Sequence, residues 1–222
     1  MTSARPIYVE IGMGKGRFVR EMARMHPEID FIGMERYASV LMKALQGVDR
    51  DGVDRQNLRF LCMDAAALTE VFGPGEVGKI YLNFPDPWPK KRHAHRRLTS
   101  GAFLDRFAAV LGAAGGLELK TDNRELFAFS LENLGDKGWE IAMVTEDLHA
   151  WMDGRGGGQT TGSGGRWADG GTSSRNTKVG GAVGGRRADG GTCENVETEY
   201  EIKFARKGKP ICKLVAFPPK LR

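Results

Sequence analysis

Two periodicities alternate along most of the chain: short apolar runs, and segments whose apolar residues recur every three or four positions. A short apolar run between turn residues is typical of a buried strand, and the longer spacing is typical of an amphipathic helix. The apolar runs predict strands at residues 7–11, 30–34, 58–62, 79–83, 116–120, 140–145 and 212–217. The helical spacing predicts helices at residues 17–25, 38–48, 103–111 and 125–134. Because strands that alternate with helices form right-handed βαβ units, we expect an α/β fold with a mostly parallel, seven-stranded sheet and helices on both faces.

One segment, residues 154–191, breaks this pattern. It has 15 Gly among 38 residues and no Leu, Ile, Phe or Met, so it offers little apolar surface to bury. Two similar stretches occur in this region, GGRWADGGT at 164–172 and GGRRADGGT at 184–192, but two copies are too few for a solenoid. We therefore expect a single domain, residues 1–222, with a Gly-rich flexible insertion at about 154–191.

Charge and cysteine content exclude few classes of function. The net charge of +5 arises mainly in the Gly-rich segment, because the rest of the chain has 27 basic and 26 acidic residues. The three cysteines are widely spaced and odd in number, which predicts neither a zinc site nor a disulfide framework, and we expect no bound metal. Residues 1–6 lack the apolar run of a signal peptide, and no stretch of about 20 apolar residues would span a membrane. These features favour a cytoplasmic protein.

A Gly-rich turn joins the first predicted strand to the first predicted helix. Gly12, Gly14 and Gly16 alternate there, and glycine lets the backbone adopt positive φ and approach a ligand closely. Dinucleotide-binding enzymes use similar spacing to place a pyrophosphate over the helix N-terminus. Glu10, at the start of this turn, would repel a pyrophosphate but attract the amino group or sulfonium of S-adenosylmethionine. A nicotinamide oxidoreductase is therefore the weaker interpretation.

Acidic residues also stand at the ends of the next two predicted strands. Glu35 ends the second strand, where a carboxylate can accept hydrogen bonds from both ribose hydroxyls of a nucleoside. Asp64 follows the third strand, where it could accept from an adenine amino group. Each acid could instead cap the helix that follows it. Because ligands bind at the carboxyl ends of such strands, the set of acids together favours a cofactor crevice.

The loop at residues 84–97 has the most unusual composition. Asp86 follows the fourth predicted strand and so opens onto the same crevice, and Pro85, Pro87 and Pro89 stiffen the backbone around it. Trp88 could stack on a purine or pack on the sheet edge. A run of charge is usually a solvated face, but one beside an aromatic residue at a strand end suits phosphate contacts with base stacking. This run contains Lys90, Lys91, Arg92, His93, His95, Arg96 and Arg97.

The loop resembles the signature of the bacterial tRNA (guanine-N7-)-methyltransferase family. Residues 10–16, 33–35, 120–123, and 198–201 with 203–204 are similar to other blocks of that family. The resemblance implies a Rossmann-like class I methyltransferase fold, with S-adenosylmethionine as cofactor and tRNA as substrate. The implied activity is methylation of N7 of the guanine at tRNA position 46, in the variable loop.

The resemblance also implies a role for each matching residue. Asp86 would be catalytic and would contact the cofactor. The other cofactor contacts would be Glu10, Gly12, Gly14, Gly16, Glu35 and Asp64. Substrate-binding positions would be Lys90, Asp122, Thr198, Glu199, Tyr200 and Glu201. RNA contacts would be made by Arg92, His93, His95, Arg96 and Arg97.

The chemistry of guanine N7 requires little from the protein beyond positioning. N7 has a lone pair and no proton to lose, so no general base is needed to generate the nucleophile. We expect Asp86 or Asp122 to accept hydrogen bonds from guanine N1–H and the N2 amino group, which would select guanine over adenine and stabilise the growing positive charge.

Two alternatives stay open at this point. One is a methyltransferase of another RNA such as rRNA, acting through the same crevice. The other is a noncatalytic RNA-binding protein on the same fold. The acids at the strand ends argue against the second alternative, because RNA binding alone does not favour acids beside a phosphate backbone.

Overall fold

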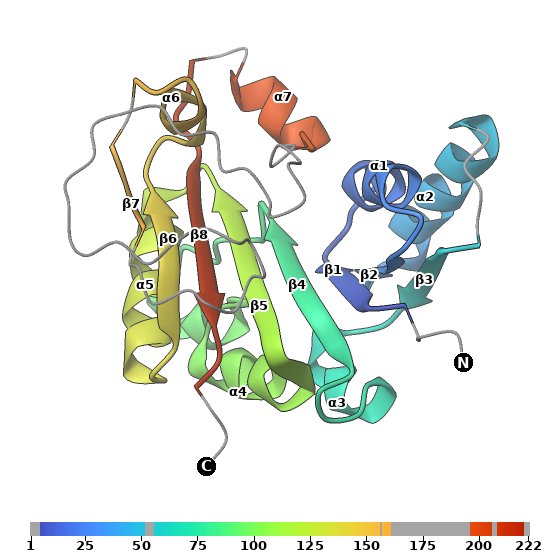
Figure 1. The fold of residues 1–222 in the computed structure, drawn as a ribbon, viewed down its shortest axis with the longest axis horizontal. Helices are drawn as coiled ribbons and strands as arrows, with labels where there is room; N and C mark the ends of the chain where they lie inside the picture. The colour runs from blue at the N-terminus through green and yellow to red at the C-terminus, as the bar shows by residue number, and fades with distance from the viewer. Residues whose placement is uncertain (1–4, 52–55, 156, 161–195, 206–207, 220–222) are drawn as a thin grey trace.

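The structure is a computed structural model that describes residues 5–51, 56–155, 157–160, 196–205 and 208–219. Within these ranges one sheet of eight strands forms the centre of the molecule, in the order β3-β2-β1-β4-β5-β8-β6-β7 (Figure 1). The strands are β1 (Ile7–Ile11), β2 (Asp30–Glu35), β3 (Leu58–Cys62), β4 (Val77–Asn83), β5 (Leu111–Thr121), β6 (Glu140–Thr145), β7 (Gly158–Thr160) and β8 (Cys212–Phe217). The helices are α1 (Arg17–Met25), α2 (Ala38–Asp51), α3 (Leu68–Val71), α4 (Gly101–Val110), α5 (Arg124–Asp136), α6 (Leu148–Met152) and α7 (Glu199–Ala205).

The pairing of the strands places a topological switch point between β1 and β4. Strands β1 to β5 pair in parallel, whereas β8 lies antiparallel between β5 and β6, and β7 pairs antiparallel with β6. The chain runs outward from β1 to β2 and β3 on one side, and from β4 to β5 on the other. The carboxyl ends of these five strands therefore meet at one edge of the sheet, with the crevice expected beside β1 and β4.

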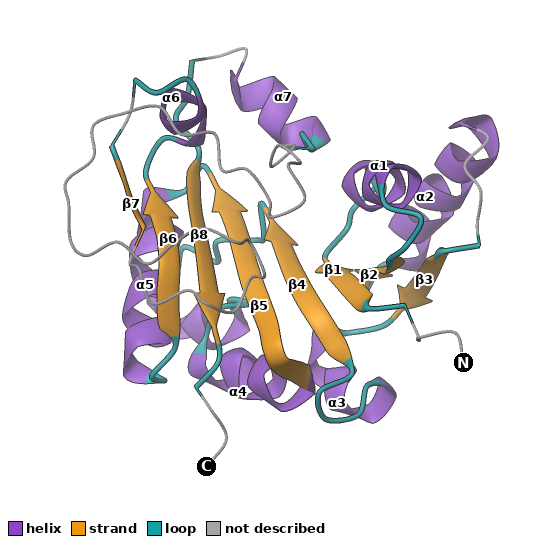
Figure 2. Cartoon of the chain, viewed as in Figure 1, coloured by secondary structure: helices purple, strands orange, loops and turns teal. Residues whose placement is uncertain are grey.

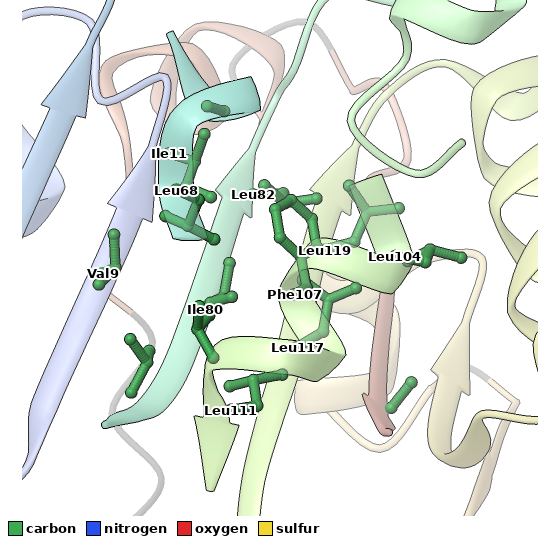
Figure 3. Packing of buried hydrophobic residues seen from close by; sticks show 14 of the residues in the cluster. Val9, Ile11, Leu68, Ile80, Leu82, Leu104, Phe107, Leu111, Leu117 and Leu119 are labelled. Atoms are coloured by element: carbon green, nitrogen blue, oxygen red, sulfur yellow. The ribbon is translucent and has the colours of Figure 1, made fainter. Parts of the chain in front are cut away.

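Alternation along the strands separates two apolar cores on opposite faces of the sheet. On one face, residues such as Val9 and Leu119 pack against α3, α4 and α5, and Figure 3 shows Phe107 of α4 beside Leu82 and Leu117. On the other face, α1 and α2 pack on residues that include Phe31 and Tyr81, which form a separate buried cluster. Helices thus cover both faces, as the alternation of strands and helices predicts.

The hydrophobic pattern predicted most of these elements. Strands β1, β3, β6 and β8 and helix α1 have the expected bounds, and the α/β fold with a mostly parallel sheet is confirmed. The helix expected at 103–111 begins at Gly101 and ends at Val110, because Leu111 already pairs with Val77 of β4. Helices α3, α6 and α7 were not predicted, since each spans seven residues or fewer and shows too little periodicity.

The start of the expected Gly-rich insertion adds the strand that makes the sheet eight-stranded. Gly158–Thr160, within the segment expected to be a flexible insertion, forms β7 at the sheet edge. Residues 156 and 161–191 of that expected insertion lie outside the described residues. Among the described helices, none combines the length and the apolar character needed to cross a membrane.

Candidate functional site

A buried carboxyl group lies at the switch point. Glu10, on β1, is 3% exposed, and Asn83 Nδ2 at the end of β4 donates a hydrogen bond to Glu10 Oε1 over 2.9 Å. Among the described residues, no group lies in hydrogen-bond geometry to Glu10 Oε2 or to Asn83 Oδ1, and both atoms are buried. Burial raises the pKa of Glu10 to about 7, against opposing contributions from the Asn83 hydrogen bond, the Val19 amide and the charge of Lys120. A buried acid with a free oxygen suits a cationic ligand group.

This pKa predicts how stability varies with pH in the protein without cofactor. The folded-state pKa of Glu10, about 7, lies above the 4.5 of an unperturbed Glu, so the folded state binds more protons between these values. The free energy of unfolding should therefore decrease as pH rises from 4.5 to 7, by up to about 3 kcal/mol. Urea unfolding from pH 5 to 8 should show this decrease in the wild type and much less of it in Glu10→Gln. Equal pH slopes for the two proteins would contradict the raised pKa.

Glu35 and the Gly-rich turn form one hydrogen-bonded unit. Gly14 N–H donates to Glu35 Oε2 over 3.2 Å, and Tyr37 N–H donates to Oε1 over 3.1 Å. Gly12, Gly14 and Gly16 have φ of 73°, 58° and 68°, which favour glycine. A Cβ atom on Gly12 or Gly14 would meet no atom within 4 Å, so open space lies beside the turn. Each oxygen of Glu35 keeps acceptor capacity for a ligand hydroxyl in that space.

Asp64 has a different environment from Glu10 and Glu35. Its side chain is exposed, and its Oδ1 accepts a hydrogen bond from Ala66 N–H over 2.9 Å, which caps the 3₁₀ turn Ala65–Ala67. Arg36 Nη1 lies 3.8 Å from Asp64 Oδ2. The capping role considered in the sequence is therefore present for Asp64, and its contact with a cofactor stays a prediction.

Asp86 lies between two residues with left-handed backbone conformations. Phe84 has φ of 51° and Trp88 has φ of 41°, and such values are uncommon for large side chains. Phe84 N–H donates to Lys120 O over 2.8 Å, which ties the start of this loop to β5. The Asp86 carboxylate is exposed and has no hydrogen-bond or ion-pair partner among the described residues, so both of its oxygens are available to a ligand. Asp122, half-buried, follows the neighbouring strand β5.

Helix α7 lies beyond the ends to which the β4 and β5 arrows point (Figure 2). Its first two residues contact both parts of the site described above. Glu199 Oε2 lies 3.1 Å from Lys15 Nζ of the Gly-rich turn. The ring of Tyr200, 58% exposed, stacks on Phe84 with centroids 6.1 Å apart and planes at 23°. Helix α7 therefore connects the Gly-rich turn with the Asp86 loop.

The next residue of α7 anchors the helix to the sheet. Lys120 Nζ donates to Glu201 Oε2 over 3.1 Å and to Val196 O over 3.4 Å, and the two paired side chains are almost completely buried. Burial lowers the pKa of Lys120, although the charge of Glu201 opposes this effect. Thr198 Oγ1 accepts from Glu201 N–H over 3.0 Å at the start of the helix. Within the four-residue block expected to bind substrate, Thr198 and Glu201 thus have structural partners, whereas Glu199 and Tyr200 are exposed.

Glu201, the partner of Lys120, also belongs to a group of three potential metal ligands, although the sequence predicted no bound metal. His149, Glu197 and Glu201 each place one ligand-type atom within 4.8 Å of the others. The ammonium of Lys120 lies 3.1 Å from one Glu201 oxygen, and this positive charge opposes a cation at the same carboxylate.

The basic loop presents most of its charge to solvent, with one exception. Arg96 is exposed and its guanidinium lies 5.1 Å from the centre of the Trp88 ring, while His93 meets the same ring edge-on at 5.7 Å. Arg97 is 8% exposed, and its guanidinium donates to the Pro87 and Trp88 carbonyls. We expected Arg97 to contact RNA, but the structure directs its side chain into the protein. The other exposed members are Lys90, Lys91, Arg92 and His95.

Comparison with known proteins finds relatives of this chain in sequence and in structure. A family model described as "Putative methyltransferase" matches residues 4–153. The tRNA (guanine-N(7)-)-methyltransferase of Lachnoclostridium phytofermentans is 41% identical over 215 residues, which cover 97% of this chain and 82% of that protein. An antibiotic-related methyltransferase has a similar structure, with a TM-score of 0.58, 13% identity, and coverage of 96% of this chain and 88% of that chain. A SAM-dependent methyltransferase from Aquifex aeolicus has a similar structure, with a TM-score of 0.50 and 15% identity. The match covers 64% of this chain and 76% of that chain. The expected class I methyltransferase fold is confirmed.

Proposed function

Because the chain belongs to the tRNA (guanine-N(7)-)-methyltransferase family, we propose that it transfers a methyl group from S-adenosylmethionine to N7 of guanine 46 in the tRNA variable loop. One observation carries the proposal: two carboxylate groups with acceptor atoms that no described residue occupies, Glu10 near the end of β1 and Asp86 in the loop after β4, lie at the same edge of the sheet. A cationic cofactor and a guanine can thus meet at one crevice. The proposal includes a cytoplasmic location and a single domain with an insertion at about 154–191.

The residues at the switch point suit the cofactor. Glu10 Oε2 is available to the amino group or the positive charge of S-adenosylmethionine, Glu35 to its ribose hydroxyls, and Asp64 to its adenine amino group. When bound, the cofactor supplies an electrophilic methyl group on a sulfonium. The open space beside Gly12 and Gly14 allows a ligand to approach the backbone of the turn.

The contribution of the protein to the reaction is to orient guanine and to balance charge. The N7 lone pair is the nucleophile, so no residue has to remove a proton before the methyl group is transferred. The Asp86 carboxylate, or that of Asp122 directly after the neighbouring strand β5, accepts hydrogen bonds from guanine N1–H and the N2 amino group. The same acceptor stabilises the positive charge that develops on the ring. Adenine lacks this pair of donors, so a carboxylate at this place selects guanine.

Glu35 provides a separate test of the cofactor site. Glu35→Gln keeps the size of the side chain but replaces one acceptor oxygen with a donor amide. We expect S-adenosylmethionine binding to weaken by about 1–3 kcal/mol, the scale for losing hydrogen bonds to a charged group. Titration calorimetry measures this change, with the exposed Glu132→Gln on α5 as the matched control. The affinity for tRNA should barely change. Wild-type cofactor affinity in a folded Glu35→Gln protein would refute the assignment.

The substrate class is tested by methyl transfer from labelled S-adenosylmethionine to purified RNAs. We expect incorporation into an unmodified tRNA transcript with G46, and none into the same transcript with A46. Incorporation into rRNA but not into tRNA would instead support a methyltransferase of another RNA. RNA binding with no incorporation into any RNA would support a noncatalytic RNA-binding protein.

A further inference from the structure

Arg97 differs from the other basic residues of its loop in what it contacts. Its Nε donates to Pro87 O over 2.9 Å and its Nη2 donates to Trp88 O over 3.2 Å. The guanidinium also lies 4.4 Å from the centre of the Phe129 ring on α5. With a residue exposure of 8%, the side chain is directed into the protein and not toward a nucleic acid.

The two carbonyls belong to the residues that directly follow Asp86. Trp88 has φ of 41° and Phe84 has φ of 51°, so strained backbone brackets Asp86 on both sides. Strained conformations persist only where surrounding contacts hold them. Phe84 is held by its backbone hydrogen bond to Lys120 and by Tyr200. On the other side Arg96 and His93 contact only the Trp88 ring, whereas the Arg97 guanidinium binds the Pro87 and Trp88 carbonyls and so holds the backbone itself.

The shape of the guanidinium fits this task. It presents several N–H donors in a rigid plane, so two donors on one edge reach two neighbouring carbonyls at the same time. The Phe129 ring supports the face of that plane. A lysine would keep the charge but would offer a single, flexible donor group in place of the fork.

We propose that Arg97 is a positioning residue that fixes the backbone after Asp86, and hence the place of the Asp86 carboxylate in the crevice. The inference rests on the proposed function, because Asp86 matters only if guanine is bound there. Under this proposal Arg97 contributes to the rate of methyl transfer and does not contact a tRNA phosphate. Its exposed neighbour Arg96 stays among the RNA-contacting residues.

Substitutions that separate charge from shape test this inference. Arg97→Lys keeps the charge, and Arg97→Gln removes it. We expect both variants to lose roughly 10- to 100-fold in the single-turnover rate at saturating tRNA and cofactor, because a displaced group loses its alignment with the substrate. The Kd for tRNA should stay within about twofold, and its salt dependence should be unchanged. Arg96→Gln should do the opposite: weaken tRNA binding and reduce the salt slope by about one.

A matched control is available on α4. Arg106 also donates to a backbone carbonyl, that of Ala102, and lies over an aromatic ring, that of Phe103, but away from the crevice. Arg106→Lys should keep the wild-type single-turnover rate. A cooperative urea unfolding transition verifies that each variant is folded, and Arg97→Lys is the milder change if Arg97→Gln does not fold.

The outcomes distinguish the inference from the function on which it rests. A wild-type rate in Arg97→Lys, or a salt slope that falls in Arg97→Gln as in Arg96→Gln, would overturn the positioning role in an enzyme that still methylates tRNA. A wild-type protein that transfers no methyl group to tRNA in the same assay would instead overturn the proposed function. A reduced rate in both Arg97 variants with an unchanged salt slope would establish the inference.

Discussion

Replacing Asp86 with Asn is expected to lower the single-turnover rate of methyl transfer by about 10²- to 10³-fold, the usual cost of removing one group that stabilises developing charge. The Asn side chain keeps the size of Asp but turns a donor amide toward the guanine N1–H and N2 amino group. Two donors then face each other, so the base is no longer held and the charge on the ring is no longer balanced. The affinity for tRNA should change less, because phosphate contacts supply most of it.

Two further variants make the Asp86 result specific. Asp86→Ala removes both acceptors and should be about as damaging as Asn if Asp86 orients the base. Asp105→Asn, which alters an exposed aspartate of α4 paired with Lys137 at the end of α5, should keep the wild-type rate. A near-normal single-turnover rate in Asp86→Asn would remove Asp86 from the catalytic assignment and leave Asp122 as the candidate.

The second large effect concerns the anchor of α7. Glu201→Gln leaves the Lys120 ammonium buried without its paired carboxylate, and breaking a buried pair in this way costs about 3–5 kcal/mol. We expect the free energy of unfolding, measured with urea at neutral pH, to fall by that amount. Glu199→Gln, two positions earlier in α7, alters the exposed pair with Lys15 and should cost at most about 1 kcal/mol.

Removing both charges distinguishes the cost of an unpaired charge from a loss of packing. Lys120→Met combined with Glu201→Leu leaves no buried charge from this pair and should recover most of the lost stability. If Glu201→Gln were as mild as Glu199→Gln, the buried pair would not anchor α7. If the double variant were less stable than Glu201→Gln alone, the effect would come from packing and not from charge.

The strand ends could be predicted because they depend on local pattern. Each strand from β1 to β4 is a short apolar run; Glu10 and Glu35 stand near the ends of two of these runs, and Asp86 lies in the loop that follows β4. Parallel strands bring their carboxyl ends to one edge, so the sequence predicted the crevice without any knowledge of side-chain contacts. The free oxygen of Glu10 was not predictable, since it depends on Asn83 and on burial from both sides.

Other features depend on contacts that the sequence does not encode locally. Arg96 and Arg97 are neighbours of the same type, and only the tertiary structure separates an exposed cation from one that binds two carbonyls. Lys120 begins the block 120–123 that resembles the family, but nothing in the sequence assigns it a role of its own. Its partner Glu201 is 81 residues away in α7, beyond the Gly-rich segment. The alternation of Glu118 and Lys120 along β5 was the one available sign of a polar face.

The most direct test of the central claim is to map the methylated atom in a tRNA transcript. N7-methylation places a positive charge on guanine, which makes that nucleotide sensitive to reduction with borohydride and then to strand cleavage with aniline. After incubation with the protein and S-adenosylmethionine, we predict a single cleavage at position 46, absent when cofactor is omitted and strongly reduced with Asp86→Asn. Methyl incorporation without cleavage, or cleavage at another position, would contradict the account.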